Sequence, residues 1–250
     1  MWKSRLCQRR QLLFALAGGL LGGAARADSL RVFADEDYYP LIHRQAERPA
    51  GLLVERLQRS SAFSGDQFVI ELVGLNRALM LAEQGEGGVL GLSYTQERAR
   101  WLDYSDPLMH DDIAVVVRRG QGFRFRGLPD LYGKTIGLPK GASFGDALEQ
   151  AIQRGDLKVQ RDWALVRRLR MLLAGRLDAA VIGGGALSLQ AAIERDPELR
   201  GQRERFELLP QPLFLDPLHL GVPKSMQMRA LLERLNRALS RMPPAPMLRR

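Results

Sequence analysis

A serine, a threonine and an arginine stand within six residues, directly after a short apolar run. The apolar run is Val89–Leu92, and the polar side chains that follow it are Ser93, Thr95 and Arg98. A guanidinium group is planar and can hold a carboxylate through two parallel hydrogen bonds. Because ligands of open α/β sheets bind beyond the carboxyl ends of the strands, this arrangement predicts a binding site for a small anion.

Each of these three residues also has a purely structural alternative. A salt bridge to Glu97 or Asp103 would make Arg98 a structural residue rather than a ligand contact. A serine at a strand end is often only a cap, which is the alternative for Ser93. For Thr95 the capping role is favoured, because a threonine before a helical turn accepts a hydrogen bond from the backbone. A share in ligand binding is the alternative for Thr95.

A second polar stretch follows the apolar run Thr135–Leu138 and contains Gly141 and Ser143. Residues 144–154 have helical periodicity, so Ser143 is predicted at the N-terminus of a helix. There, free backbone N–H groups and the helix dipole favour an anion. A plain N-cap is the alternative for Ser143, and the two roles are compatible. Gly141 has no side chain, and we expect its backbone to approach the ligand closely.

Other residues of chemical interest give weaker signals. His110, Asp111 and Asp112 are metal-ligand types, but the sequence holds only three histidines, and they are scattered. Neither a metal nor another cofactor is therefore expected. Trp101 and Trp163 are expected in the core or at a rim, with contact to the ligand as the alternative for Trp163.

The composition is that of a folded protein of modest charge. Of 250 residues, 46% are hydrophobic and 26% are charged, which excludes general disorder. The net charge is +9, but residues 1–27 carry five basic residues and no acid. The remainder has 32 basic and 28 acidic residues, a net charge of +4. This balance gives little reason to expect a nucleic-acid partner, and none is predicted.

Residues 1–27 have the three parts of an export signal. Basic residues come first, at Lys3, Arg5, Arg9 and Arg10. The apolar run Leu12–Leu21 follows, and Ala25–Ala27 places small residues before a predicted cleavage site at Asp28. A membrane anchor is the less favoured alternative, because the run is short for a hydrocarbon core of about 30 Å. We therefore expect a periplasmic protein.

Two details of this segment bear on the mature protein. Arg9 and Arg10 loosely resemble a twin-arginine signal, so both the general and the twin-arginine export routes stay open. Cys7 is the only cysteine of the chain. The mature chain is thus expected to contain no disulfide, and thiol chemistry is excluded.

Strand-like and helical patterns alternate from residue 28 onward. Apolar runs typical of buried strands cover residues 30–34, 68–73, 89–92, 113–117, 135–138, 178–182 and 219–222. Helical patterns cover residues 52–57, 77–84, 144–154, 167–174 and 225–241. This alternation predicts an α/β protein with crossover helices. The arginines of the last helix, Arg229, Arg234, Arg237 and Arg241, are expected on a solvated face.

The chain is predicted to form two units. A second unit begins after Arg118-Arg119-Gly120, and the chain crosses back after Leu208-Leu209-Pro210. We therefore assign residues 1–27 to the signal peptide, residues 28–117 and 215–250 to lobe 1, and residues 118–214 to lobe 2.

Four groups of segments occur in the order seen in a known family. They are Leu30–Val32 with Asp35–Pro40, Ser93–Arg98 with Leu102–Pro107, Leu131–Leu138 with Lys140–Ser143, and Gly175–Ala179. Together they resemble the bacterial extracellular solute-binding proteins of family 3, the polar-amino-acid receptors of ABC importers. The resemblance implies an α/β fold of the periplasmic-binding-protein type (type II), with two lobes joined by two crossings around a ligand cleft.

The resemblance also implies roles for single residues. Arg98 would hold the ligand carboxylate, Tyr38 would pack on the ligand, and Asp35 could meet the ligand side chain. The protein would be a monomeric receptor rather than an enzyme. It would bind a small carboxylated ligand, an amino acid or a related compound, and present it to a membrane permease or sensor.

One position departs from the pattern of the family. Receptors for α-amino acids usually carry an acid five residues after the position of Asp178, where it pairs with the ligand ammonium. In this sequence the position is Gly183. A buried ammonium without a carboxylate partner is costly. Either the ligand is not a standard α-amino acid, which we favour, or another acid supplies the charge. The candidate acids are Asp35, Glu36, Asp37 and Asp112.

Two other functions fit the same resemblance. An enzyme on this fold, such as a cyclohexadienyl-dehydratase-like lyase, would need a general acid or base in the cleft. Glu36, Asp37 and His43 are the candidates. The other alternative is an orphan sensory or accessory domain without its own transporter, which the change at Gly183 favours.

Overall fold

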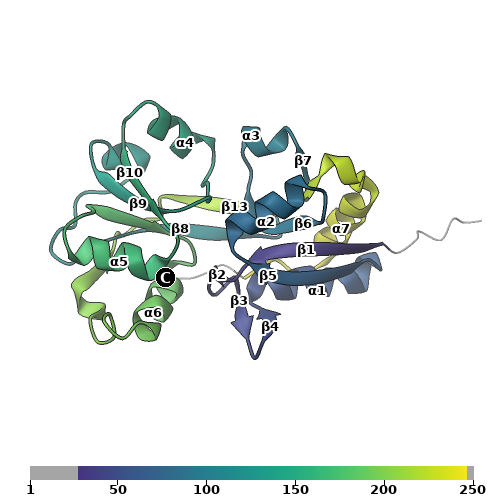
Figure 1. Ribbon diagram of the computed structural model, residues 1–250, viewed down its shortest axis with the longest axis horizontal. Coiled ribbons are helices and arrows are strands. Elements are labelled where there is room, and N and C mark those ends of the chain that lie inside the picture. The colour runs from purple at the N-terminus through teal and green to yellow at the C-terminus, as the bar shows by residue number, and fades with distance from the viewer. Residues whose placement is uncertain (1–27, 247–250) are drawn as a thin grey trace, which may run out of the picture.

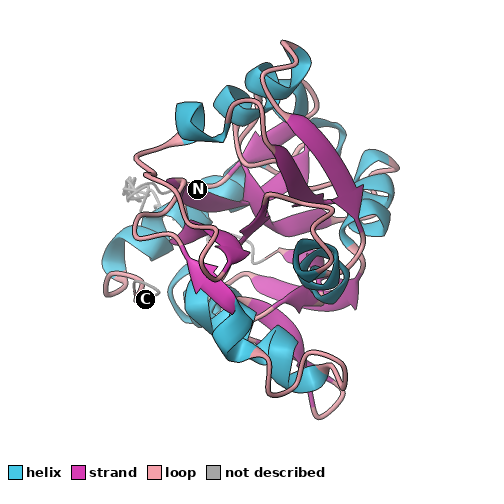
Figure 2. Ribbon diagram, turned by 90° about the vertical axis from the view of Figure 1, so that its left-hand side faces the viewer, coloured by secondary structure: helices cyan, strands magenta, loops and turns pink. Residues whose placement is uncertain are grey.

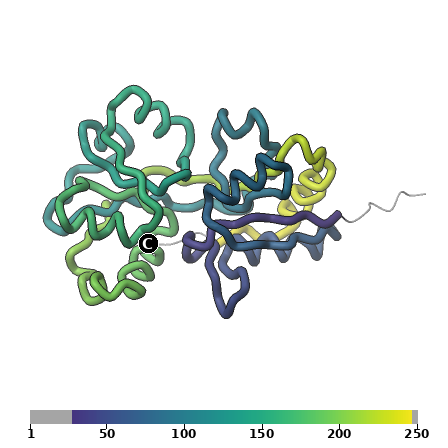
Figure 3. Tube along the Cα trace, in the orientation of Figure 1, coloured from purple at the N-terminus to yellow at the C-terminus, as the bar shows by residue number. Residues whose placement is uncertain are grey.

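The computed structural model describes residues 28–246. The predicted export signal, including Cys7, lies outside these residues. The described chain forms two α/β lobes that lie side by side and are joined by two long strands (Figure 1; Figure 3). The predicted fold class is therefore confirmed.

Thirteen strands and seven α-helices make up the described part of the chain. The strands are β1 Ser29–Asp35, β2 Asp37–Tyr38, β3 Ile42–Gln45, β4 Arg48–Ala50, β5 Gln67–Val73, β6 Gly88–Ser93, β7 Leu102–Tyr104, β8 Met109–Arg118, β9 Thr135–Pro139, β10 Lys158–Asp162, β11 Ala179–Ile182, β12 Phe206–Leu208 and β13 Phe214–Pro223. The helices are α1 Leu52–Ser64, α2 Leu75–Glu83, α3 Gln96–Ala99, α4 Asp146–Gln153, α5 Leu165–Leu173, α6 Gly185–Arg195 and α7 Arg229–Arg241. Short 3₁₀ turns cover Leu128–Leu131, Arg203–Arg205 and Lys224–Met226.

One sheet runs through both lobes. Its strand order is β10-β9-β11-β8-β13-β6-β1-β5, with β12 paired to β8 and β7 paired to β13. Within each lobe the outer strands are parallel, as in the pairs of β1 with β5 and of β9 with β10. Helices flank the strands on both sides, as Figure 2 shows. A small separate sheet, β2-β3-β4, projects from the first lobe.

The crossing strands, β8 and β13, join the lobes. They pair antiparallel through residues 109–113 and 214–218. Beyond this stretch β8 pairs with β11 and β12, while β13 pairs with β6 and β7. Each crossing strand therefore lies between the lobes at one end and belongs to the sheet of one lobe at the other.

The hydrophobic cores divide along the same line. Two clusters of buried side chains draw on residues 30–109 and 218–239, and two others draw on residues 113–213. The packing changes lobe between Met109 and Ile113 on β8, and between Phe214 and Leu218 on β13. The boundary residues given above for the two lobes stay a prediction, since each change of lobe falls inside a continuous strand.

The predicted elements are present, and all of the missed ones except α6, which has 11 residues, are short. The elements that the apolar patterns did not indicate are β2, β3, β4, β7, β10, β12, α3 and α6. The predicted helix over residues 144–154 begins only at Asp146, and its N-cap is Gly145. Ser143 therefore lies in the loop before the helix, so both its predicted place at the helix N-terminus and the alternative of a plain N-cap are wrong.

The predicted C-terminal helix is also interrupted. A 3₁₀ turn occupies Lys224–Met226, and α7 begins at Arg229. Arg234 does not lie on a solvated face, because its side chain is only 13% exposed and is paired with Asp66 and Asp28. Among the helices of residues 28–246, none is both long and apolar enough to cross a membrane.

Candidate functional site

A cavity of about 570 Å³ lies between the lobes. The first lobe contributes Asp35, Tyr38, Ser93 and Arg98 to its wall, and the second lobe contributes Ser143, Arg168 and Gly183. Five of the seven predicted ligand-binding residues thus meet in one cavity. The other two, Thr95 and Gly141, support it from behind.

Arg98 is buried at the wall of this cavity. Its Nη2 donates a hydrogen bond to the carbonyl of Gly141 (3.0 Å), and its Nη1 makes a weaker one to the carbonyl of Ser93 (3.4 Å). Within residues 28–246 no carboxylate forms an ion pair with Arg98, and Asp103 pairs with Arg229 instead. Burial lowers the pKa of Arg98 from its ordinary value, because the charged form is taken out of water. The salt-bridge alternative for Arg98 is therefore wrong.

Thr95 is the N-cap of α3, the turn that carries Arg98. The Oγ1 of Thr95 accepts a hydrogen bond from the backbone N–H of Arg98 (3.2 Å). This bond orients the turn that directs the guanidinium toward the cleft. The favoured capping role of Thr95 is confirmed.

Gly141 brings the two lobes into close contact. Its φ is +80°, and a Cβ atom at this position would lie 2.0 Å from Oδ1 of Asn76, on α2 of the first lobe. The absence of a side chain at Gly141 therefore admits Asn76 of the opposite lobe. A ligand contact of Gly141 stays a prediction.

The two serines also meet across the cleft. The Oγ of Ser93 lies 2.6 Å from Oδ2 of Asp216 and 2.8 Å from the carbonyl oxygen of Ser143. A hydroxyl has a single proton, so Ser93 can donate to only one of these oxygens at a time. The Oγ of Ser143 is buried and has no hydrogen-bond partner within the described chain. An unpaired buried hydroxyl is costly, so Ser143 is a group that a bound molecule could satisfy.

Tyr38 and Asp35 lie on the first-lobe side of the cavity. The hydroxyl of Tyr38 donates a hydrogen bond to Oδ2 of Asp111 (2.7 Å), so its ring position is set by the crossing strand β8. Burial raises the pKa of Asp35 to about 6, and Arg168 on the other lobe partly offsets this rise. Asp35 is thus a desolvated acid that a cationic group would stabilise.

The space at Gly183 is taken by Tyr38 and Asp111. A Cβ atom at Gly183 would lie 2.6 Å from Oδ2 of Asp111 and 2.6 Å from Cε2 of Tyr38. Both carboxylate oxygens of Asp111 also accept a hydrogen bond from the N–H of Gly184 (3.0 Å each). Asp111 was not among the four acids considered as replacements, yet it is the acid that lies against Gly183. Strand periodicity could have indicated it, because Asp111, Ile113 and Val115 lie on the same face of β8.

Arg168 and Asp216 are further residues that the sequence patterns did not indicate. Arg168 extends from α5 to the cavity wall and pairs with Asp162 (3.0 Å), and both side chains are buried. Asp216 lies on the crossing strand β13 beside Ser93. Burial raises its pKa to about 7, with the nearby charge of Asp111 adding to the rise.

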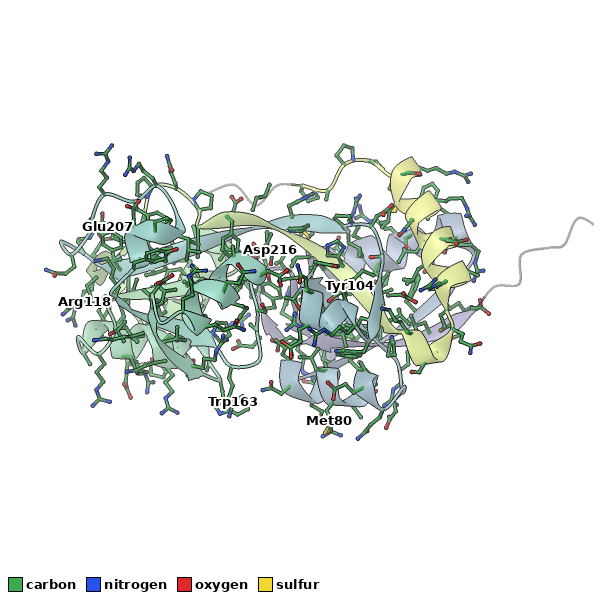
Figure 4. All side chains as sticks on the ribbon, turned by 90° about the horizontal axis from the view of Figure 1, so that it is seen from above. Met80, Tyr104, Arg118, Trp163, Glu207 and Asp216 are labelled. Atoms are coloured by element: carbon green, nitrogen blue, oxygen red, sulfur yellow. The ribbon has the colours of Figure 1, made fainter. Side chains whose placement is uncertain are left out.

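The two tryptophans and the His110–Asp112 stretch lie in different parts of the molecule. Trp163 lines the cavity while 63% exposed, and the Nζ of Lys140 lies 4.3 Å from the centre of its ring. Figure 4 shows Trp163 at the edge of the molecule, between the lobes. Trp101 packs against the core of the first lobe. His110 is exposed whereas Asp111 is buried, and within residues 28–246 no three side chains of metal-ligand type come together.

Of the residues expected for acid–base catalysis, only the two acids line the cavity. Glu36 lines it but is paired with Arg44 (2.8 Å), and Asp37 lines it nearby. His43 lies opposite Asp37 in the small sheet but is not part of the cavity wall, and its ring packs against Tyr39 at a tilt of 59°. A histidine and a carboxylate directed at one point of the cleft are therefore not found in the described chain.

Comparisons with known proteins agree with this geometry. The family model of the bacterial extracellular solute-binding proteins, family 3, matches residues 30–248. No curated protein matches the chain. Solved structures also match it, and the three given below are at most 24% identical to this chain, so they bear on the fold alone.

Three of these structures are a sensor domain and two amino-acid-binding proteins. A histidine kinase sensor domain with similarity to periplasmic binding proteins is 24% identical, with a TM-score of 0.68, covering 85% of this chain and 89% of its own. An ancestral arginine-binding protein bound to arginine is 22% identical, with a TM-score of 0.66, covering 86% and 92%. The arginine-, lysine-, histidine-binding protein ArtJ from Geobacillus stearothermophilus is 20% identical, with a TM-score of 0.64, covering 85% and 88%.

Proposed function

This chain belongs to the bacterial extracellular solute-binding proteins, family 3, and on that basis we propose that it binds a small carboxylated solute, an amino acid or a related compound, between its two lobes. One observation carries the proposal. Arg98 is a buried cation at the wall of an interlobe cavity, and its hydrogen-bond partners in the described chain are two carbonyl groups rather than a carboxylate. A ligand carboxylate would supply the missing negative charge.

The groups around Arg98 suggest how the solute is oriented. The unpaired hydroxyl of Ser143 is available as a second contact for the carboxylate. Asp35, a desolvated acid on the first lobe, would favour a cationic or hydrogen-bond-donating group at the other end of the solute. Because these groups come from both lobes, the bound solute would stabilise the closed arrangement.

We further propose a periplasmic receptor that delivers its solute to an ABC importer. The family supports this partner. The second candidate is a sensory or accessory domain without its own transporter, and the similarity to a histidine kinase sensor domain favours it. An enzymatic role, such as that of a cyclohexadienyl-dehydratase-like lyase, has less support, because Glu36 is paired with Arg44 and His43 is not part of the cavity wall.

A thermal-shift screen tests the binding function. The mature chain would be heated with L-amino acids, dicarboxylates, aromatic carboxylic acids and prephenate, since a bound solute raises the melting temperature by mass action. At least one carboxylate should raise it. Arg98→Met should abolish that rise by removing two charge-assisted hydrogen bonds, a loss of about 3 kcal/mol or roughly 100-fold in affinity.

Arg100→Met is the matched control. Arg100 is exposed and lies two residues from Arg98, so its loss should leave the ligand-induced rise unchanged. If no carboxylate raises the melting temperature of the wild type, solute binding is not supported. Product formation from prephenate would show an enzyme instead. The neighbouring genes would then separate an importer subunit from a sensory domain.

A further inference from the structure

The two crossing strands each place a buried carboxylate behind residues that line the cavity. Asp111 on β8 and Asp216 on β13 are direct partners in the antiparallel register. Asp111 is 0% exposed and Asp216 is 4% exposed. Figure 4 shows Asp216 in the middle of the molecule, where β13 runs between the lobes. Side chains directly opposite in an antiparallel pair are close enough to interact.

Asp111 binds groups from both lobes. It accepts the hydroxyl proton of Tyr38, which belongs to the first lobe, at 2.7 Å. It also accepts the backbone N–H of Gly184, at the start of α6 in the second lobe, at 3.0 Å. A rotation of the lobes that separates Tyr38 from Gly184 would break at least one of these hydrogen bonds.

Asp216 has a similar role on the other crossing strand. Its Oδ2 lies 2.6 Å from the hydroxyl of Ser93, in the first lobe. The same hydroxyl is 2.8 Å from the carbonyl of Ser143, in the second lobe. Asp216 is therefore part of a chain of polar contacts that runs from the crossing strand through Ser93 to the opposite lobe.

The charges around the two carboxyl groups are mainly negative or neutral. Asp111 faces Tyr38 and the N–H of Gly184, with the negative charges of Asp112 and Asp216 nearby. Asp216 faces Ser93, Asp111 and one cation, Arg98. Two carboxylates that are close together and out of water cannot both ionise easily, and sharing a proton relieves the repulsion.

We propose that Asp111 and Asp216 form a carboxylate clasp that takes up a proton when the lobes close and that positions Tyr38 and Ser93 at the cleft. The proposal rests on the solute-binding function and adds a regulation to it. Closure, and hence solute affinity, would be favoured by acid.

The direction of the pH effect follows from burial. In the closed arrangement burial raises the pKa of Asp111 to about 6 and that of Asp216 to about 7, from an ordinary value of 3.8. Opening admits water to these groups, so their pKa values fall toward the ordinary one. The closed form therefore binds the proton more tightly. Lowering the pH through about 7 and then about 6 favours closure, and the effect levels off below about 4.

Solute binding and proton binding at Asp216 should also strengthen each other directly. The charge of Arg98 lowers the pKa of Asp216. A solute carboxylate bound to Arg98 would cancel that charge, so Asp216 would hold its proton more strongly. By reciprocity, a protonated Asp216 strengthens the binding of the anionic solute.

Small-angle X-ray scattering of the solute-free mature chain at pH 8 and pH 6 tests the clasp. One shared proton with a closed-form pKa near 7 should raise the ratio of closed to open molecules roughly tenfold when the pH is lowered from 8 to 6. The radius of gyration should therefore fall at pH 6. Asp111→Asn and Asp216→Asn mimic the protonated side chain, so each should weaken this pH dependence. Asp112→Asn, on the other face of β8, removes only a charge that adds to the rise in the pKa of Asp111, so it should weaken the pH dependence less than either of these variants.

Tyr38→Phe is a second variant that keeps the buried ring. The hydroxyl of Tyr38 lowers the pKa of Asp111 by its hydrogen bond, so its removal should move the midpoint of closure to higher pH. If Tyr38 had only a structural role, Tyr38→Phe would leave this midpoint unchanged.

Two outcomes would overturn the clasp: an unchanged radius of gyration in the wild type between pH 8 and pH 6, or an equal loss of pH dependence in Asp112→Asn. Calorimetric titration at pH 8 and pH 6 with L-arginine, succinate and phenylpyruvate, which represent amino acids, dicarboxylates and aromatic carboxylic acids, separates this result from the binding function. A solute that binds equally at both pH values would refute the clasp and keep the receptor. A pH-dependent radius of gyration without any binding solute would keep the clasp and refute the receptor.

Discussion

Two arginines of this protein are removed from solvent in opposite ways. Arg234 on α7 is bound by two acids: its Nη2 lies 2.7 Å from Asp66 and 2.6 Å from Asp28. Arg98 in the cleft has carbonyl groups as hydrogen-bond partners and no carboxylate within the described residues. The pKa of Arg234 is raised by its hydrogen bonds to Asp66, whereas burial lowers the pKa of Arg98.

The contrast separates a structural charge from a functional one. Asp66 is fully buried in the turn between α1 and β5, and it also accepts the backbone N–H of Asp28. The ion pairs of Arg234 thus connect the last helix to the start of β1. Under the proposed function, Arg98 instead stays without an internal counter-charge so that an anionic solute can bind, which costs stability in the free protein.

The largest expected effect is on the structural side. Arg234→Met should lower the free energy of unfolding by about 3 kcal/mol, because it leaves the buried carboxylate of Asp66 without its cation. Urea denaturation would measure the loss. Arg237→Met, on the exposed side of the same helix, is the control and should change little. An equally small effect of both variants would remove the contrast on which the comparison rests.

Gly183→Ala should have the next largest effect. The added Cβ would meet Asp111 and Tyr38 at 2.6 Å, and overpacking of this kind costs about 2 kcal/mol. Gly74→Ala is the matched change, because a Cβ there has no heavy atom within 4 Å and the φ of Gly74 is not positive. Unfolding curves of the two variants should therefore differ. Equal curves would mean that the space at Gly183 is not needed.

The pH dependence of stability should distinguish the cleft from the rest of the molecule. Burial raises the pKa of Asp35 and of Asp111 to about 6, and that of Asp216 to about 7. Acids whose pKa is raised by folding stabilise the folded state when protonated, and this contribution is lost as the pH rises through 6 and 7. The free energy of unfolding should therefore increase from pH 8 to pH 5.

Urea denaturation at pH 8, 7, 6 and 5 measures this trend, and Arg234→Met should keep it at lower overall stability. A stability that falls steadily from pH 8 to pH 5 would contradict the burial of these acids in the folded protein.

The smallest effect on stability is expected at Arg98. Arg98→Met removes a desolvated charge together with its two hydrogen bonds to carbonyl groups, so the free energy of unfolding should change by no more than about 1 kcal/mol. The same variant should lose solute binding. Differential scanning calorimetry without solute would check the first expectation. A loss of unfolding free energy as large as that of Arg234→Met would show that Arg98 is a structural residue. The contrast between Arg98 and Arg234 would then not hold.

Local patterns were sufficient for most of the elements and for part of the site. The apolar runs at residues 89–92 and 135–138 correspond to β6 and β9, and Ser93, Arg98 and Ser143, which follow them, line the cavity. Thr95 caps the turn that carries Arg98, a contact between residues only three apart. Such signals are local, so periodicity and capping rules can read them.

Other parts of the site depend on residues that are far apart in the chain. Asp111 meets Tyr38 and Gly184, each 73 residues away, and Ser93 meets Asp216 at a separation of 123. Arg234, expected in solvent, finds Asp66 at a separation of 168. No local pattern contains these pairs, because they arise only when the sheet has its final strand order.

The sequence by itself determined that the chain forms two α/β lobes, that Arg98 follows a buried strand, and that position 183 carries no side chain. The tertiary structure alone decided what surrounds these features: the pairing of Asp111 with Asp216, the filling of the space at Gly183, and the different partners of Arg98 and Arg234. The physical reason is that strand and helix formation depends on neighbouring residues, whereas the environment of a buried charge depends on every segment that packs against it.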